Sequence, residues 1–136
     1  MTREDKELLL KDLCARLPYG VKMNHIADDE HSPKTLIGVA KDMITLEGLG
    51  GYECVDVENY KPYLFPLSSM TDEQKKKYNW LKHSVFVCHY EYGDVVEEIE
   101  LYDSPESFEY LIENHFDYRG LIEKGLAIDA TGLNIY

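Results

Sequence analysis

Two short stretches of the sequence carry residue types that could do chemistry. His25 and the run from Asp28 to His31 combine imidazole and carboxylate groups, which are ligands for divalent metals. Their spacing fits neither HExxH nor an EF-hand loop, so we interpret this stretch as a solvated turn between two strands. The other stretch, HSVFVCH, begins at His83, and in a strand its Cys88 and His89 would point to opposite faces. These patterns therefore predict no catalytic residue, no cofactor and no metal site.

The negative charge of the chain is concentrated in its C-terminal part. Ten of the twelve net negative charges fall within residues 85–136, where twelve acids face two bases. A protein that binds the backbone of nucleic acid needs clustered lysine and arginine, so the charge excludes that class of partner. It instead predicts a contact with a basic partner protein. The candidate contact residues are five acids and two aromatic residues: Glu98, Glu100, Glu106, Glu109, Glu113, Tyr63 and Phe65.

Length and composition favour one globular domain over residues 1–136. No stretch reaches the roughly 18 apolar residues of a membrane span, and the charged N-terminus leads into only three leucines. The three cysteines are far apart and form no CxxC pair. We therefore expect a cytoplasmic protein that does not bind membranes, with each thiol acting as a small buried apolar residue.

The N-terminal half predicts one helix followed by several strands. Thr2 can cap a helix over residues 3–16, whose leucines recur at helical spacing. The segment from Lys61 to Ser69 holds two prolines, which predicts an extended edge or a loop. It could pack as a strap across the sheet, or it could expose Tyr63 and Phe65 as a contact site. Alternating side chains predict strands at residues 21–25, 35–40 and 52–57.

Further helices are expected in the C-terminal half. Thr71 and Gln74 form a capping box that opens a helix to about Lys82. Ser104 and the proline after it begin an amphipathic helix over residues 105–115. A short last helix is expected from Arg119 to Lys124.

Residues 84–102 predict a β-hairpin with its turn at Gly93-Asp94. This register places His89 directly opposite Glu98 on one face. The other face is apolar apart from Glu97, so we expect it in the core. The apolar residues of that face are Phe86, Cys88, Tyr90, Tyr92, Val95, Ile99 and Leu101.

Together these elements predict an α+β fold. We expect a single domain with an antiparallel sheet of about five strands. The helices at residues 3–16 and 105–115 would pack on one face of that sheet.

Two segments carry a resemblance to other proteins. They are KPYLFPLSSMT, which begins at Lys61, and FDYRGLIEKGLA, which begins at Phe116. Both resemble segments of small uncharacterised proteins encoded in gut-bacterial genomes and their prophages or mobile elements. The resemblance implies a cytoplasmic bacterial or phage setting, and it supplies no activity and no site residues.

Three functions are compatible with these patterns. The leading prediction is a non-catalytic interaction or accessory protein whose acidic C-terminal half contacts a basic partner. An alternative is a small enzyme or ligand-binding protein whose site gathers distant residues such as His25, Cys54 or Asp117. A further alternative is a homodimer joined along a sheet edge.

Overall fold

The computed structural model describes residues 1–136 and shows an α+β protein, as the sequence predicts. Two compact units make up the chain. The first unit joins residues 1–69 to residues 112–136, and the second consists of residues 70–111. No helix in the structure combines the length and the apolar composition that crossing a membrane requires.

A mixed sheet of seven strands forms the base of the first unit. Its strands are β1 (Lys22–His25), β2 (Lys34–Val39), β3 (Met43–Gly48), β4 (Gly51–Asp56), β5 (Tyr60–Pro66), β8 (Phe116–Asp117) and β9 (Ile128–Asp129). Their order is β4-β3-β2-β1-β5-β8, and β9 also pairs with β5. The sheet thus exceeds the five antiparallel strands expected, because β8 and β9 add parallel pairs to β5. Two-residue strands are too short to show alternation in a sequence.

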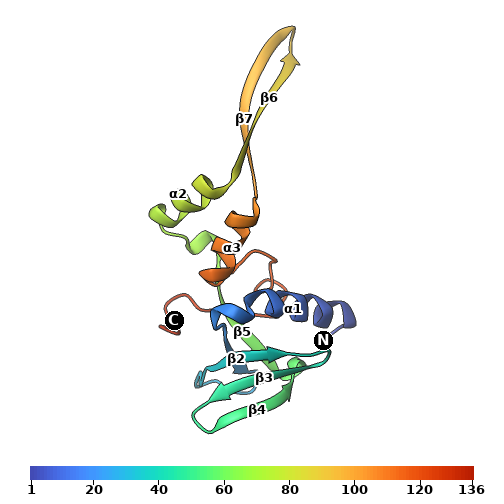
Figure 1. The fold of residues 1–136 in the computed structure, drawn as a ribbon, viewed down its shortest axis with the longest axis vertical. Helices are drawn as coiled ribbons and strands as arrows, with labels where there is room; N and C mark the ends of the chain where they lie inside the picture. The colour runs from blue at the N-terminus through green and yellow to red at the C-terminus, as the bar shows by residue number, and fades with distance from the viewer. The chain divides into compact units, whose positions relative to one another are not determined.

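The helix α1 (Arg3–Arg16) lies along one side of this sheet (Figure 1). The hydroxyl of Thr2 accepts a hydrogen bond from the backbone N–H of Asp5 at 3.1 Å, so the helix begins where the sequence predicts. The 3₁₀ helix η1 (Leu17–Tyr19) follows it. Gly20 then adopts a φ of 67°, a left-handed conformation that ends the helical segment.

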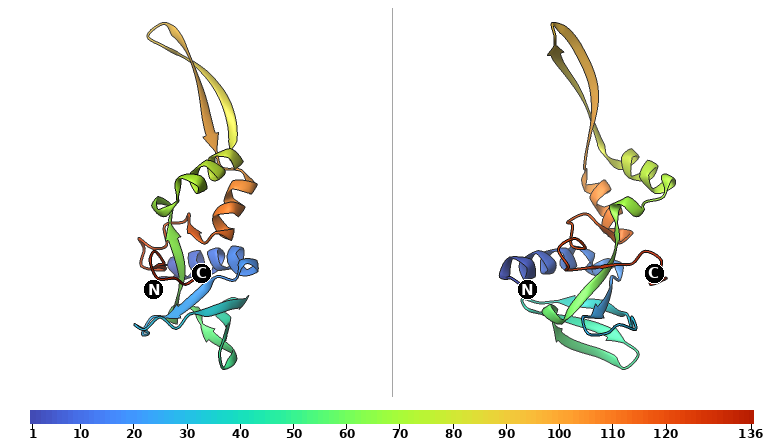
Figure 2. Two further views of the ribbon diagram at one scale, coloured as in Figure 1. Left: turned by 90° about the vertical axis from the view of Figure 1, so that its left-hand side faces the viewer. Right: turned by 180° about the vertical axis from the view of Figure 1, so that it is seen from behind.

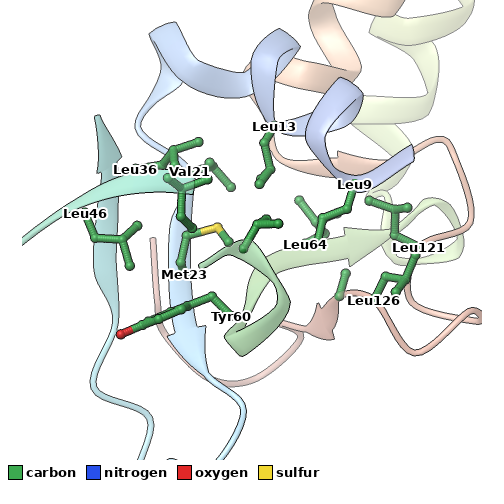
Figure 3. Packing of buried hydrophobic residues seen from close by; sticks show 13 residues of the cluster. Leu9, Leu13, Val21, Met23, Leu36, Leu46, Tyr60, Leu64, Leu121 and Leu126 are labelled. Atoms are coloured by element: carbon green, nitrogen blue, oxygen red, sulfur yellow. The ribbon is translucent and has the colours of Figure 1, made fainter. Parts of the chain in front are cut away.

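The core of the first unit lies between α1 and the sheet. Figure 3 shows Leu9 and Leu13 of α1 directed toward Leu64 of β5 and its neighbours. Leu121 and Leu126 from the C-terminal part of the chain belong to the same buried cluster. The tail is therefore a component of the core.

The strand β5 corrects the prediction that the proline segment forms an edge or loop. It lies inside the sheet, between β1 and the parallel partners β8 and β9. Pro62 pairs with Met23 at one end of the β1 ladder, and Pro66 pairs with Asp117 at the end of the β8 ladder. Each proline thus sits where pairing stops, which is where a missing N–H is tolerated. The short 3₁₀ helices η2 (Val57–Asn59) and η3 (Leu67–Ser69) flank this strand.

Tyr136 ties the last residues of the chain to the sheet. Its hydroxyl accepts a hydrogen bond from the backbone N–H of Lys22 at 2.8 Å. The same hydroxyl donates to the carbonyl oxygen of Tyr63 at 2.9 Å. Its ring stacks on His115 with 3.7 Å between the ring centroids.

Replacing Tyr136 with phenylalanine should destabilise the protein by about 1–2 kcal/mol, because the Lys22 N–H loses its acceptor. Urea unfolding followed by circular dichroism measures this change. Tyr92→Phe is the control, since Tyr92 is 98% exposed. Equal unfolding midpoints for the two variants would contradict the role given to the Tyr136 hydroxyl.

The second unit contains α2 (Asp72–Leu81), β6 (His83–Glu91), β7 (Asp94–Tyr102) and most of α3 (Pro105–Glu113). The capping box of Thr71 and Gln74 is present, as predicted. Within this unit the long β6–β7 ribbon extends away from both helices (Figures 1 and 2). The packing of the 105–115 helix on the sheet stays a prediction.

Candidate functional site

The β6–β7 hairpin turns at Tyr92 and Gly93, one residue earlier than the sequence predicts. Both residues have positive φ, 51° and 85°, as a type I′ turn requires at its two central positions. The predicted register was therefore wrong by two residues. His89 pairs with Val96, and Glu98 pairs with Val87. A shift of two leaves every side chain on its expected face.

One face of this hairpin is apolar and open to solvent. We call it the apolar face and define it by Phe86, Tyr90, Val95, Ile99 and Leu101. Phe86 is 62% exposed, Tyr90 81% and Ile99 70%. The expectation that this face enters the core was wrong. The ribbon extends beyond its helices, so no element of its own unit covers it (Figure 2).

Acidic residues distinguish the two faces of the hairpin. Residues 83–102 contain five acids and no lysine or arginine. Four of the acids, Glu91, Asp94, Glu98 and Glu100, share the face opposite the apolar face. Glu97 alone lies among the apolar residues, where it pairs with Cys88, and it is exposed rather than directed into the core.

Polar contacts fix the base of the hairpin to the helices beside it. The hydroxyl of Tyr78 in α2 donates a hydrogen bond to the carboxylate of Asp103, just after β7. Burial and this bond raise the pKa of Tyr78. The Ser104 hydroxyl donates to the carbonyl oxygen of Leu81 at 2.7 Å and accepts from the N–H of Ser107 at 3.0 Å. The hairpin is thus held at its base and free along its length.

The contact residues that the sequence predicts lie on several different elements. Glu98 and Glu100 lie on β7, and Tyr102 donates a hydrogen bond to Glu100. The three acids of α3 are all exposed: Glu106, Glu109 and Glu113. Contact between these acids and a partner stays a prediction.

Tyr63 and Phe65 lie on β5 within the sheet, so the segment forms neither a strap across the sheet nor an exposed contact site. Tyr63 is fully buried, and its hydroxyl lies 2.7 Å from Nδ1 of His31. Burial raises the pKa of Tyr63 to about 12. Phe65 is half-buried and packs against Phe116 and Tyr136. Tyr63 therefore offers no side-chain surface to a partner.

The loop after His25 is held by its own backbone. The carboxylate of Asp28 accepts hydrogen bonds from the N–H groups of Glu30 and Ser32 at 2.9 and 3.1 Å. These bonds lower the pKa of Asp28. A cavity of about 210 Å³ next to this loop is lined by Asn24, His25, Asp28, His31, Lys61 and their neighbours. No three histidine, cysteine or acidic side chains in the chain are placed to share a metal ion.

The residues named for the enzyme alternative lie in separate places. Cys54 and Asp117 do not line the cavity beside His25. Asp117 accepts hydrogen bonds from the N–H groups of Leu121 and Ile122, both at 2.9 Å. These bonds hold residues 121–125 as turns, so the short last helix expected there was wrong. Cys14, Cys54 and Cys88 are all exposed, which also corrects the expectation of buried thiols.

The sequence predicts that the apolar face of the hairpin lies in the core, whereas the structure exposes it. Phe86, Tyr90 and Ile99 follow the alternation of a half-buried strand, and a docking face has the same alternation as a core face. The one signal available was Glu97, since a core face seldom includes a carboxylate.

Comparison of this chain with protein-family models, with curated proteins and with solved structures finds no match. The protein can therefore be classified only by the features of its own structure. It is an α+β protein that carries an amphipathic β-ribbon with one uncovered apolar face.

Proposed function

We propose that this protein is a non-catalytic docking module that binds a partner protein through the apolar face of its hairpin. The exposure of Phe86, Tyr90 and Ile99 carries the proposal. Large exposed apolar patches with polar rims are typical of protein contact sites. An isolated two-stranded hairpin is also only marginally stable in water, so a partner that covers one face would stabilise it.

The charge of the hairpin supports a basic partner. Its five acids are opposed by no lysine or arginine within residues 83–102. The exposed acids of α3 in the same unit, Glu106 and Glu109, add to this negative field. Such a field accelerates the approach of a positively charged protein and weakens as salt is added. It disfavours nucleic acid and anionic membranes as partners.

The position of Glu97 on the apolar face indicates that the partner surface carries a positive charge. A carboxylate enclosed between two apolar surfaces is strongly destabilised unless a cation pairs with it. The partner surface is therefore apolar with a lysine or arginine placed to meet Glu97. We also propose a cytoplasmic setting in a bacterium or prophage, supported by the resemblance of residues 61–71 and 116–127 and by the three unpaired thiols.

A selection of randomised 12-residue peptides on the full-length protein provides a defined probe. The selected peptides should combine aliphatic or aromatic residues with lysine or arginine. Fluorescence anisotropy of one labelled peptide then gives its Kd for each variant at low and moderate salt. Tyr90→Ser should raise the Kd about tenfold, because an aromatic anchor is lost from the contact surface.

Tyr102→Ser is the matched control, since Tyr102 is an exposed tyrosine on the opposite face. It should change the Kd less than about twofold. Glu97→Gln should weaken binding and reduce its dependence on salt, whereas Glu98→Gln on the other face should change it little.

Equal effects of Tyr90→Ser and Tyr102→Ser would overturn the proposal. So would binding of phosphatidylcholine vesicles that is lost in Tyr90→Ser, since the apolar face would then serve a membrane.

A further inference from the structure

We infer that the free edge of β6 pairs with the β6 strand of a second copy, so that two hairpins form one four-stranded antiparallel sheet. This inference concerns the edge of the hairpin, whereas the proposed function concerns its apolar face. Pairing at the edge and binding at the apolar face can occur together, and each can be tested without the other.

The position of the turn determines which backbone groups of β6 are unpaired. Glu91 and Asp94 flank the two-residue turn and form a hydrogen-bonded pair. Bonded and non-bonded pairs alternate from there along an antiparallel ladder. The N–H and C=O groups that point away from β7 belong to Ser84, Phe86, Cys88 and Tyr90.

The edge of β6 lacks the devices that normally prevent strand pairing. Proteins protect exposed edges with charged residues, prolines or bulges. β6 is nine residues long, contains no proline, lysine or arginine, and has one acid, Glu91, at its end. β7 instead carries four acids: Asp94, Glu97, Glu98 and Glu100. Pairing through β6 is therefore favoured over pairing through β7.

One two-fold register satisfies every free backbone group of this edge. If Val87 faces Val87 of the second copy, Phe86 pairs with Cys88 and Ser84 pairs with Tyr90 across the contact. All four outward-facing residues then lie in bonded pairs, giving about eight backbone hydrogen bonds. Two-fold pairing of this kind is closed, because each copy uses the same edge.

The same register places no two acids of the paired edges opposite each other. It places His83 at one end of β6 opposite Glu91 of the second copy, and the symmetry repeats this pair at the other end. The acids of both β7 strands lie on the outer strands of the joined sheet, which keeps them apart. Stacking two apolar faces would instead bring the two Glu97 carboxylates into one apolar interface. Edge pairing also places both apolar faces on the same side.

Disulfide trapping tests the register in the full-length chain. With Cys14, Cys54 and Cys88 replaced by serine, Val87→Cys should form an intermolecular disulfide under copper-phenanthroline. Non-bonded antiparallel pairs have Cα atoms about 4.5 Å apart, within the range that a disulfide spans. Val96→Cys is the matched control, because Val96 lies on the same face of the hairpin as Val87 but belongs to β7. Cross-linking of both variants, or of neither, would overturn the register.

Sedimentation equilibrium of the wild-type chain tests the association itself. The expected mass is twice the chain mass of 15.8 kDa. Val87→Lys should raise the dimer Kd about tenfold, since two lysines would face each other at the two-fold axis. In its own hairpin the new lysine faces Glu98, so the hairpin is retained. Val96→Lys should change the Kd less than about twofold.

A wild-type mass of 15.8 kDa at all concentrations would overturn the inference, even if the cysteine or lysine variants failed to fold. A series of larger polymers would also overturn it, since these require open pairing of β6 with β7. If Tyr90→Ser abolishes peptide binding while the protein keeps the mass of a dimer, both the proposed function and the inferred dimer are supported. A monomer that binds peptide through Tyr90 would leave only the proposed function.

Discussion

Asp12→Ala is expected to lower the free energy of unfolding by about 3–5 kcal/mol, the largest effect of any substitution considered for this protein. Asp12 and Arg16 in α1 are both fully buried. The Arg16 Nε donates to the Asp12 carboxylate at 2.7 Å, and its Nη2 donates to the carbonyl oxygen of Phe116 at 2.6 Å. Arg119 lies 3.3 Å from the second oxygen of Asp12. Removal of the carboxylate leaves the Arg16 guanidinium buried without a counter-charge.

Urea unfolding of two further variants isolates this cause. Glu7→Ala removes an exposed pair with Arg3 in the same helix and should change stability by less than about 0.5 kcal/mol. The double variant Asp12→Leu with Arg16→Met replaces both charges with apolar groups and should recover most of the loss. If the double variant is less stable than Asp12→Ala, the ion pair itself, rather than the uncompensated charge, supplies the stability.

Below neutral pH, His115 is expected to destabilise the folded protein. Burial, together with the positive charges of Arg16 and Lys22, lowers its pKa from 6.5 to about 4. Its Nδ1 is buried without a hydrogen-bond partner. Between pH 6.5 and 4 the unfolded chain therefore binds a proton that the folded protein does not. Stability falls as the pH decreases through this range, by up to about 1.4 kcal/mol per pH unit, and this group has no effect above it.

The comparison of wild type with His115→Asn measures this contribution. Asparagine tolerates the φ of 62° that His115 adopts, and it has no proton to gain. The difference in unfolding free energy between the two proteins should be constant from pH 7 to 8 and should shift in favour of the variant by about 2–3 kcal/mol at pH 4. A difference that stays constant down to pH 4 would contradict the lowered pKa.

Local chemistry explains why the helix starts could be predicted from the sequence. Thr2, Thr71 and Ser104 cap their helices with side-chain contacts to residues at most three positions away. No information about the rest of the fold is needed for such contacts. The same holds for the hairpin, whose two strands were expected within one or two residues of their observed bounds.

What could not be predicted depends on long-range or unusual features. Tyr92 adopts a positive φ that non-glycine residues rarely take, so the Gly93-Asp94 turn was the natural expectation, and the register followed from it. The parallel pairs of β5 with β8 and β9 join residues about fifty or more positions apart, and nothing in a two-residue strand indicates its partner. The exposure of the apolar face depends on the absence of an element to cover it, which periodicity does not encode.

The insertion of the second unit into the first has a consequence for how the chain reaches its native state. β5 emerges from the ribosome before residues 70–111, but its parallel partners β8 and β9 emerge only after them. The buried cluster around Leu64 of β5 is therefore complete only after Leu121 and Leu126 have been synthesised. Contacts of such high sequence separation are slow to form, because the intervening loop must be closed first. During synthesis the part of this core that precedes residue 70 stays exposed until the whole second unit has been made. In this interval the nascent chain is most susceptible to aggregation and to binding by a chaperone.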